Sequence, residues 1–187
     1  MTKQQTPHKF RRLEADPHRD HIQGPANAPV TLMEYGDYQC PYCGEAYSIV
    51  KQLQQKFDNN LRFVFRNFPL AQIHSHAEVA AEAAEAAGAQ NKFWEMHDYL
   101  YEHQNQLAAP QLIAAAKPLG LDVQRFTDDL NRHAYAERVR EDFLSGVRAG
   151  VNGTPTFFTN GVRHDGAWDF DSLSEAINAQ LQKRNAA

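Results

Sequence analysis

The two cysteines of the chain lie three positions apart, as Cys40 and Cys43 in the run Cys-Pro-Tyr-Cys. Two thiols at this spacing can exchange bonds with another disulfide, or they can supply half of a zinc site. Zinc takes four ligands, and His74 with His76 would be the obvious other half. Pro41 and a helix that begins directly after Cys40 favour thiol chemistry over a metal site.

Thiol exchange needs a cysteine that is ionised near pH 7, because only the thiolate attacks a disulfide. We expect Cys40 at the first turn of a helix, where free backbone N–H groups and the helix dipole favour an anion. Pro41 suits that turn, since its missing N–H would have had no partner there. The dipole lowers the pKa by about one unit at most, so hydrogen bonds from Cys43, one turn along the same face, must supply the rest.

The sequence around the pair predicts a strand, a helix and a second strand. Residues 30–35 are rich in strand-forming types and end at Gly36, and apolar residues recur at helical spacing over 40–57. Residues 61–66 then alternate as a strand that Pro69 closes. This order indicates a βαβ unit with two parallel strands.

The middle of the chain, residues 72–149, is rich in alanine and predicts helices only. Glycine and proline residues separate the expected helices at 75–88, 91–104, 110–118, 122–131 and 134–149.

Strand patterns return near the end of the chain. Asn160-Gly161 between residues 156–159 and 162–164 predicts a β-hairpin, and a last helix is expected over 171–183. The order of elements predicts an α/β fold with one mixed sheet and helices on both faces. The expected organisation is a flexible N-terminal segment (1–25) that includes at most a short edge element, one domain formed by 26–71 and 150–187, and an inserted helical subdomain (72–149).

The composition of the 187-residue chain fits one globular domain, or a small domain with an insertion. A chain of this length can bury a core, so it needs no disulfide bond in order to fold. The net charge of −4 indicates no strongly basic surface, and we expect neither nucleic acid nor a membrane as a partner. No apolar run approaches the roughly 20 residues of a membrane-spanning helix.

Residues 1–12 are polar and lack the apolar stretch of a secretory signal. If Met1 is native, we expect a cytoplasmic protein; if it is not, the chain fits a mature periplasmic protein. In a reducing cytosol a lone cysteine pair is more often catalytic or metal-binding than structural.

On these motifs the chain resembles the DsbA-like family of thioredoxin-fold thiol–disulfide oxidoreductases, over about residues 25–183. The resemblance rests on the strand 30–35 leading into 37–43, on the run 153–158, and on Asn160-Gly161 with Gly166. It implies a thioredoxin fold with an inserted all-helical subdomain.

The resemblance also implies the roles of the site residues. Cys40 would be the nucleophile and Cys43 the resolving thiol, and Thr154–Pro155 would be a cis peptide beside the disulfide. The alternative interpretation is that Pro155 only begins a strand and has no part in the site. The expected catalytic residues are Cys40, Cys43, Thr154, Pro155 and Glu34, and the expected substrate-binding residues are Pro41, Tyr42, Gly153 and Thr154.

Glu34 lies six residues before Cys40, where this fold commonly keeps a buried acid. It shares a strand face with Val30 and Leu32. Burial would raise its pKa and allow it to carry the proton of Cys43. The alternative is an acid at the end of the strand that reaches water.

We therefore expect disulfide exchange with cysteine-containing protein substrates, with the Cys40–Cys43 pair as the redox centre, no other cofactor and no metal. Glutathione or a thioredoxin-type protein would be the reductant. The best-known dipeptide of the relatives that oxidise substrates has histidine where this chain has Tyr42, so we expect a milder oxidant than the enzyme with that histidine. The alternatives are a glutaredoxin-like, glutathione-dependent reductase and a non-catalytic metal-binding or peptide-binding module.

Other residues are expected to be structural. His74, His76 and His164 should lie in water, and Glu78, Glu82 and Glu85 should form the wet side of their helix. Aromatic residues that should pack in the core or between helices are Phe93, Trp94, Tyr99 and Tyr101.

Overall fold

In residues 13–185, the part of the chain that this computed structural model describes, five strands form one mixed sheet. The central strands β2 (Val30–Gly36) and β3 (Leu61–Asn67) are parallel, as the strand–helix–strand order predicts. The strand order is β1-β3-β2-β4-β5, and the other three strands run antiparallel to their neighbours. These are β1 (His21–Gln23), β4 (Thr156–Thr159) and β5 (Val162–Arg163).

The hairpin between β4 and β5 turns at Asn160-Gly161. Both residues have a positive φ, 48° at Asn160 and 76° at Gly161, which a tight two-residue turn of this kind requires. The Asn160 side chain also accepts a hydrogen bond from the backbone N–H of Thr31 at 2.8 Å. The hairpin is thereby fixed to β2, the strand that leads to the cysteines.

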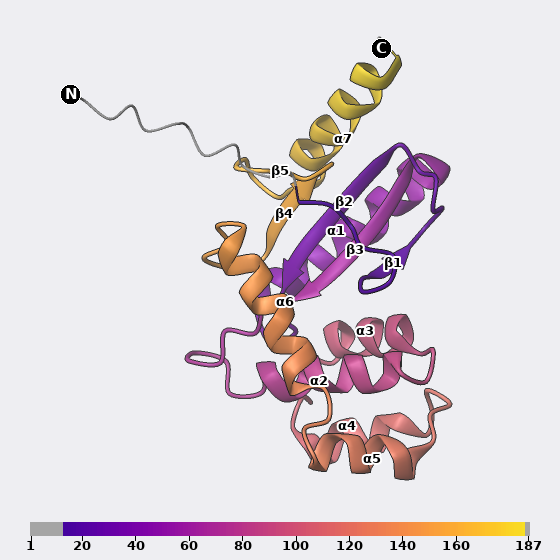
Figure 1. Ribbon diagram of the computed structural model, residues 1–187, viewed down its shortest axis with the longest axis vertical. Helices are drawn as coiled ribbons and strands as arrows, with labels where there is room; N and C mark the ends of the chain where they lie inside the picture. The colour runs from indigo at the N-terminus through magenta and orange to yellow at the C-terminus, as the bar shows by residue number, and fades with distance from the viewer. Residues whose placement is uncertain (1–12, 186–187) are drawn as a thin grey trace, which may run out of the picture.

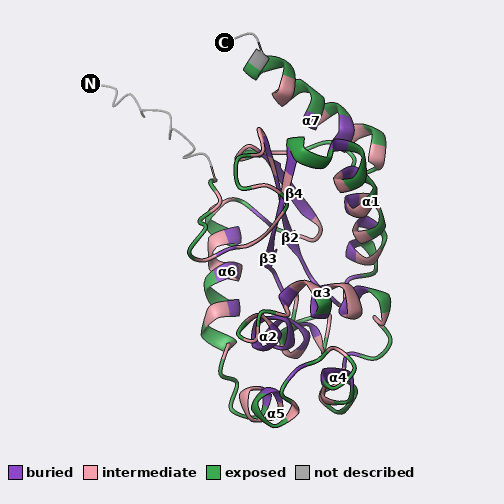
Figure 2. Ribbon diagram, turned by 90° about the vertical axis from the view of Figure 1, so that its right-hand side faces the viewer, coloured by how far each residue is buried: buried purple, intermediate pink, exposed green. Residues whose placement is uncertain are grey.

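Helices cover both faces of the sheet. The helices α1 (Pro41–Phe57) and α7 (Phe170–Asn185) lie on one face, and α6 (Ala136–Arg148) lies on the other (Figure 1 and Figure 2). Gly146 lets α6 approach closely, because a Cβ there would come within 2.7 Å of the Phe68 ring. Since α6 also contacts the helical block formed by the helices between residues 77 and 131, it joins this block to the sheet.

The helical block lies beyond the carboxyl ends of β2 and β3, whose arrowheads point towards it in Figure 1. Cys40 follows the carboxyl end of β2, so the block flanks the end of the sheet that carries the cysteines. The fold thus confirms the predicted sheet with inserted helices, and each helix of the insertion ends within two residues of its expected bounds. The helices of the insertion are α6, described above, together with α2 (Ala77–Gly88), α3 (Phe93–Glu102), α4 (Ala109–Ala116) and α5 (Val123–Asn131).

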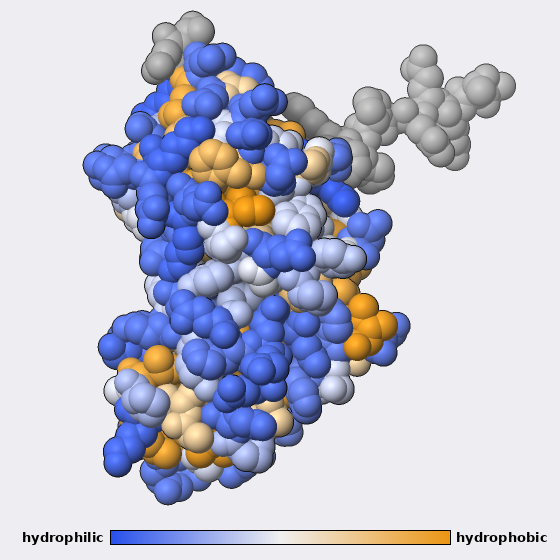
Figure 3. All heavy atoms as spheres, turned by 180° about the vertical axis from the view of Figure 1, so that it is seen from behind, coloured by the Kyte–Doolittle hydropathy of each residue, from blue (hydrophilic) through white to orange (hydrophobic). Residues whose placement is uncertain are grey.

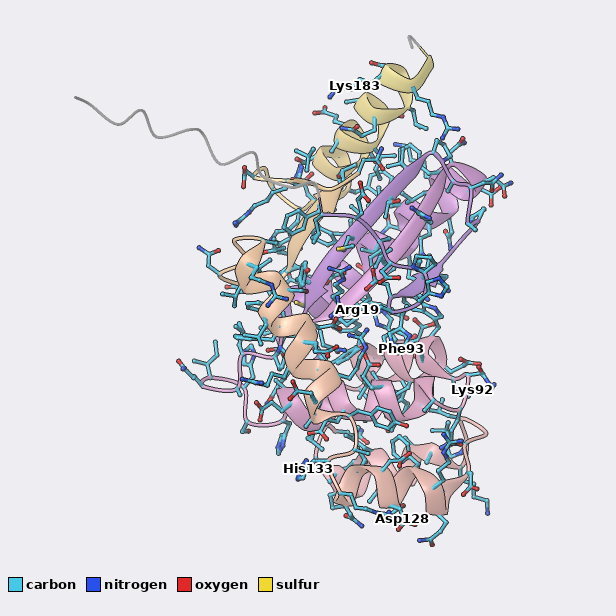
Figure 4. All side chains as sticks on the ribbon, in the orientation of Figure 1. Arg19, Lys92, Phe93, Asp128, His133 and Lys183 are labelled. Atoms are coloured by element: carbon cyan, nitrogen blue, oxygen red, sulfur yellow. The ribbon has the colours of Figure 1, made fainter. Side chains whose placement is uncertain are left out.

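The N-terminal region contains the short edge element allowed within residues 1–25, but its described residues are held more firmly than a flexible segment. Residues 1–12 lie outside the described part, but β1 pairs with β3 at the edge of the sheet. Asp20 is buried and accepts two hydrogen bonds from Arg66, at 2.7 and 2.8 Å. Arg19, labelled in Figure 4, donates to Asp142 of α6 at 2.6 Å. Paired backbone and buried ion pairs therefore make residues 13–25 part of the fold.

The acidic residues of α2 are not all on a wet side. Glu78 is exposed, whereas Glu82 and Glu85 are each only 5% exposed. Glu85 accepts a hydrogen bond from Asn67 at 2.8 Å and pairs with His21 at 2.9 Å. The expectation was wrong for Glu82 and Glu85, because α5, α6 and the N-terminal region cover that side of the helix.

The face of the molecule seen in Figure 3 is mainly hydrophilic, with apolar residues in scattered patches. The large apolar side chains that the structure leaves exposed include Ile73 in the loop after β3 and Tyr42 beside the cysteines. Among the residues described, no helix has both the length and the apolar character that crossing a membrane would require.

Candidate active site

Cys40 is the N-cap residue of α1, with extended backbone angles, and Pro41 begins the helix. The backbone N–H of Cys40 donates to the carbonyl oxygen of Asp37 at 3.1 Å, and its own carbonyl accepts from Gly44 at 3.2 Å. Both cysteines are free thiols; Cys43 is completely buried and Cys40 is 3% exposed. The helix thus presents Cys40 at its positive end and places Cys43 one turn further inside.

The loop before β4 brings Thr154 to Cys40. The Thr154–Pro155 peptide bond is cis, and the Cys40 Sγ lies 3.5 Å from the carbonyl oxygen of Thr154. Thr156, which begins β4, donates its hydroxyl hydrogen to the carbonyl of Gly153 at 2.7 Å. Residues 114 positions apart in the chain therefore meet at one sulfur atom.

The surroundings of Cys40 lower its pKa to about 5, from a usual value of 9.0. The largest cause is a hydrogen bond from the Cys43 side chain, and burial of Cys40 opposes it. The Thr154 side chain and the backbone N–H groups of Cys43 and Tyr42 lower the pKa further. Cys40 is therefore a thiolate at neutral pH, the form that attacks disulfides.

The surroundings of Cys43 act in the opposite direction. Burial raises the pKa of Cys43 well above 9.0, and the hydrogen bond to Cys40 and the charge of Glu34 raise it further. The backbone N–H of Asp37 donates to the Cys43 Sγ at 3.5 Å and opposes this shift. Cys43 therefore keeps its proton at neutral pH.

Glu34 lies on β2, opposite Phe65 of β3 and Phe157 of β4, and is 2% exposed. The strand continues past it to Gly36, so Glu34 does not reach water at a strand end. Burial, together with the charge of Cys40, raises the pKa of Glu34 to about 8. Its Oε1 has no hydrogen-bond partner within the described part of the chain. The structure thus places a protonatable carboxyl group near both cysteines.

Sequence reasoning missed a buried carboxylate next to the cysteines, which is held by three hydrogen-bond partners. The Asp37 carboxylate accepts hydrogen bonds from the backbone N–H groups of Gln39 and Leu70, both at 2.8 Å. It also pairs with the His74 Nδ1 at 2.7 Å. His74 was expected to lie in water, which was wrong, because it fastens the loop after β3 to the segment that holds Cys40.

A second missed residue comes from the helical insertion. The Gln104 side chain, just after α3, donates to the carbonyl oxygens of Tyr38 and Cys40, both at 2.9 Å. Gly44 leaves room for it, since a Cβ at that position would collide with the Gln104 side-chain oxygen. The sequence offers no signal for Gln104 beyond its polar type. The insertion thus supports the backbone of the cysteine segment from behind.

The expected substrate-binding residues surround the Cys40 sulfur. Tyr42 is 59% exposed, and its ring centroid lies 6.4 Å from that of Trp168. Pro41 is also exposed, and Gly153 is half-buried in the loop before the cis proline. These residues form an accessible rim around a mostly buried sulfur.

The zinc alternative required His74 and His76 beside the two cysteines. In residues 13–185, no three His, Cys, Asp or Glu side chains come together as a group that could hold a metal ion. His74 instead pairs with Asp37, and the backbone N–H of His76 donates to the side chain of Gln39 at 2.6 Å.

A mixed sheet that presents a Cys-x-x-Cys pair at a helix N-terminus, opposite a cis proline, defines the thioredoxin-fold class of redox proteins. The chain belongs to the thioredoxin family: the sequence model described as Thioredoxin matches residues 17–179.

Solved structures confirm the resemblance to DsbA-like proteins. Oxidised BdbD from Bacillus subtilis superposes with a TM-score of 0.81 and 26% identity, over 88% of this chain and 94% of that one. A thioredoxin-like oxidoreductase from Silicibacter pomeroyi gives a TM-score of 0.78 and 27% identity, over 89% and 94%. The α-DsbA1 protein of Wolbachia pipientis, at 21% identity and a TM-score of 0.74 over 91% and 94%, shares the fold. The chain is thus similar to DsbA-type oxidoreductases along nearly its whole length.

Sequence relatives include much longer proteins. The Na(+)/H(+) antiporter NhaA 1 of Salinispora arenicola is 49% identical over 167 residues, which cover 89% of this chain and 26% of that protein. The antiporter NhaA of Herminiimonas arsenicoxydans is 42% identical over 164 residues, covering 88% and 26%. The chain therefore spans about a quarter of the length of these relatives.

Proposed function

We propose that the chain is a thiol–disulfide oxidoreductase that exchanges disulfides with cysteine-containing protein substrates through Cys40 and Cys43. The observation that carries the proposal is the opposite shift of the two thiols. The pKa of Cys40 is lowered to about 5, while that of Cys43, one turn away, is raised. One sulfur is thus ready to attack, and the other is held back until a mixed disulfide forms.

In the reducing direction, the Cys40 thiolate attacks one sulfur of the substrate disulfide, and the other substrate sulfur leaves as a thiolate. Cys43 then attacks the Cys40 sulfur, and its proton passes to the Glu34 carboxylate. The bond between Cys40 and the substrate breaks, and the second substrate sulfur leaves. The substrate has gained two electrons, and the chain now holds a Cys40–Cys43 disulfide.

In the oxidising direction the same steps run backwards. A substrate thiolate attacks Cys40 of the disulfide, and Cys43 leaves and takes a proton from Glu34. With its pKa raised to about 8, Glu34 is mostly protonated at neutral pH and suits this donor role. An oxidant such as a second disulfide must then restore the pair.

The rim supports binding of an extended substrate segment. Thr154 and Gly153 offer backbone groups beside the Cys40 sulfur, where a peptide could pair as an added strand. Tyr42 is exposed and offers an apolar contact without a positive charge, so we propose a milder oxidant than relatives with histidine there. A thiol reductant, either glutathione or a thioredoxin-type protein, would return the disulfide to the dithiol.

The test is to trap the mixed disulfide with a disulfide-bonded protein substrate. Cys43→Ser should accumulate a covalent adduct on Cys40 that dithiothreitol releases, and Cys40→Ser should form none. Exchange that survives in Cys40→Ser would overturn the proposal and favour a binding module. Turnover that requires glutathione would instead identify the glutaredoxin-like alternative.

A further inference from the structure

Tyr101 carries a buried hydroxyl that neither the fold nor the proposed exchange steps explain. It projects from α3 of the helical insertion, is 6% exposed, and its Oη has no hydrogen-bond partner among the residues described. Its ring packs against Phe65 of β3, with centroids 6.2 Å apart and the planes at 83°. Phenylalanine could fill the same space, and an unpartnered buried hydroxyl costs about 1–3 kcal/mol. The hydroxyl therefore calls for a functional reason.

The Tyr101 hydroxyl lies beside Glu34. A Cβ built on Gly36 would be 2.8 Å from the Tyr101 Oη and 2.9 Å from the Glu34 Oε1. Glu34 and Gly36 point to the same face of β2, because side-chain directions alternate along a strand. The two oxygens thus gather around one glycine, and both lack partners within residues 13–185. Any side chain at position 36 would occupy this space.

The two oxygens also lie close to Cys43. Burial raises the pKa of Tyr101 well above 10.0, and the next causes are the charges of Cys43 and Glu34. Tyr101 therefore keeps its proton at neutral pH and can act as a hydrogen-bond donor there. Such a donor stabilises a carboxylate and lowers its pKa.

We propose that Tyr101 is a positioning residue for proton transfer at Cys43. Its hydroxyl donates a hydrogen bond to Glu34, directly or through one water, when that carboxylate takes the Cys43 proton. The inference rests on the proposed exchange function and deepens it. It gives the helical insertion a direct part in the resolving step, in which Cys43 attacks Cys40 and the substrate sulfur leaves.

The groups around this proton site come from several elements. The strand neighbours of Glu34, Phe65 and Phe157, carry no charge. His97 of α3 packs its ring 5.1 Å from that of Tyr101, and burial lowers the pKa of His97 well below 6.5, so it is neutral. Besides one another, the titratable groups whose charges or hydrogen bonds act on Glu34, Tyr101 or Cys43 are Cys40, Asp37 and Tyr38.

The experiment follows the reaction of the reduced protein with 5,5′-dithiobis(2-nitrobenzoate) in a stopped-flow instrument over a range of pH. A first thionitrobenzoate is released when Cys40 attacks the reagent, and a second is released when Cys43 attacks the adduct. In the wild type, the rate of the second release should rise with pH through the ionisation of Glu34, and the hydrogen bond from Tyr101 should bring this inflection below the pKa of about 8 that Glu34 has without such a bond.

The variant is Tyr101→Phe, which keeps the ring and removes the hydroxyl. In this variant the pH profile of the second thionitrobenzoate release should inflect about one pH unit higher than in the wild type. This shift corresponds to a tenfold slower second release at pH 7. The rate of the first thionitrobenzoate release should equal that of the wild type, which would show that Cys40 and its surroundings are intact in the variant. The matched control is Tyr47→Phe, because Tyr47 stacks on Tyr101 at 5.3 Å but bonds to Glu102, and its profile should follow the wild type.

The outcomes separate this inference from the proposed function. Glu34→Gln should abolish the pH inflection of the second release; if it does so while Tyr101→Phe matches the wild type, Tyr101 has no role and the exchange proposal stands. A Tyr101→Phe variant that slows both releases equally at every pH has a merely structural defect, which also overturns the inference. If Glu34→Gln keeps the inflection, the proposed proton carrier is itself wrong.

Discussion

The active site has two regions, each with one cysteine, and their surroundings shift the pKa of the cysteine in opposite directions. The mouth consists of Cys40, Tyr42 and Thr154, where the free N–H groups of a helix end and neighbouring hydrogen-bond donors face one sulfur. The floor consists of Cys43 and Glu34, where burial dominates and each group keeps its proton more tightly than usual. One helical turn therefore separates a sulfur that is stabilised as an anion from one that is stabilised as a neutral thiol. The comparison teaches that position at the helix end matters as much as the chemistry of the side chain.

The largest expected effect is on the stability of the floor. The pKa of Glu34 is raised from 4.5 to about 8 in the folded protein, so the folded state holds the Glu34 proton more tightly than the unfolded state does. The resulting contribution of protonated Glu34 to the free energy of unfolding is fully present below pH 4.5 and is lost as the pH rises through 8. Relative to wild type, Glu34→Gln should therefore gain about 1.4 kcal/mol in free energy of unfolding per pH unit across that window.

Urea denaturation of the reduced proteins between pH 4 and pH 9 measures this difference. Glu78→Gln is the matched control, because Glu78 is an exposed glutamate on α2. A constant difference between Glu34→Gln and wild type across the window would show that Glu34 is not a buried acid.

The next effect is on the rate of the resolving step. Glu34→Gln should slow the attack of Cys43 on a glutathione adduct of Cys40 by about a hundredfold, the usual loss when a proton-transfer group is removed. Quenched samples analysed by mass spectrometry would show the adduct persisting. Equal lifetimes of the adduct in the variant and the wild type would contradict a role for the floor carboxyl group.

At the mouth, Cys43→Ala should raise the pKa of Cys40 more than any other single change at the site, because the Cys43 hydrogen bond is the largest cause of its shift. Cys43→Ser should raise it less, since a hydroxyl still donates. The pH dependence of alkylation by iodoacetamide reports this pKa directly. Identical profiles for the alanine and serine variants would show that the donor at position 43 is unimportant.

A smaller shift is expected from Thr154→Val, which keeps the shape of the side chain and removes its hydroxyl. The pKa of Cys40 should rise by about one unit or less, because Thr154 contributes less than Cys43. The pH dependence of alkylation measures this pKa as well. A profile identical to that of the wild type would show that the Thr154 hydroxyl has no effect on the pKa of Cys40.

The smallest expected effect comes from support behind the mouth. Gln104→Ala removes two hydrogen bonds to backbone carbonyls and should lower the free energy of unfolding by about 1–2 kcal/mol. Gln111→Ala, on the exposed side of α4, should leave it unchanged. If both variants unfold at the same urea concentration, the insertion does not brace the cysteine segment.

The mouth was more predictable from the sequence than its supports. Local patterns placed the strand before Cys40 and the helix after it, and the family resemblance pointed to Thr154–Pro155 and Glu34. The His74 and Gln104 contacts join residues 37 and 64 positions apart, and no periodicity or motif encodes such pairs. They depend on where the insertion and the loop after β3 come to lie against α1.

The same reason explains the wrong expectation for α2. A helical pattern shows which positions share a face, but not how many neighbouring elements cover that helix. Glu82 and Glu85 are buried because separate parts of the chain pack over them, with His133 and His21 as partners.

At neutral pH one cysteine of the pair is ionised and the other is not. The most direct measurement is the ultraviolet absorbance of thiolate in the reduced protein, titrated over pH, with Cys40→Ser and Cys43→Ser to assign the signals. One thiolate should appear with a midpoint at about pH 5 and belong to Cys40, and Cys43 should stay protonated beyond pH 9.0. Two thiols that ionise together near pH 9.0 would contradict the account.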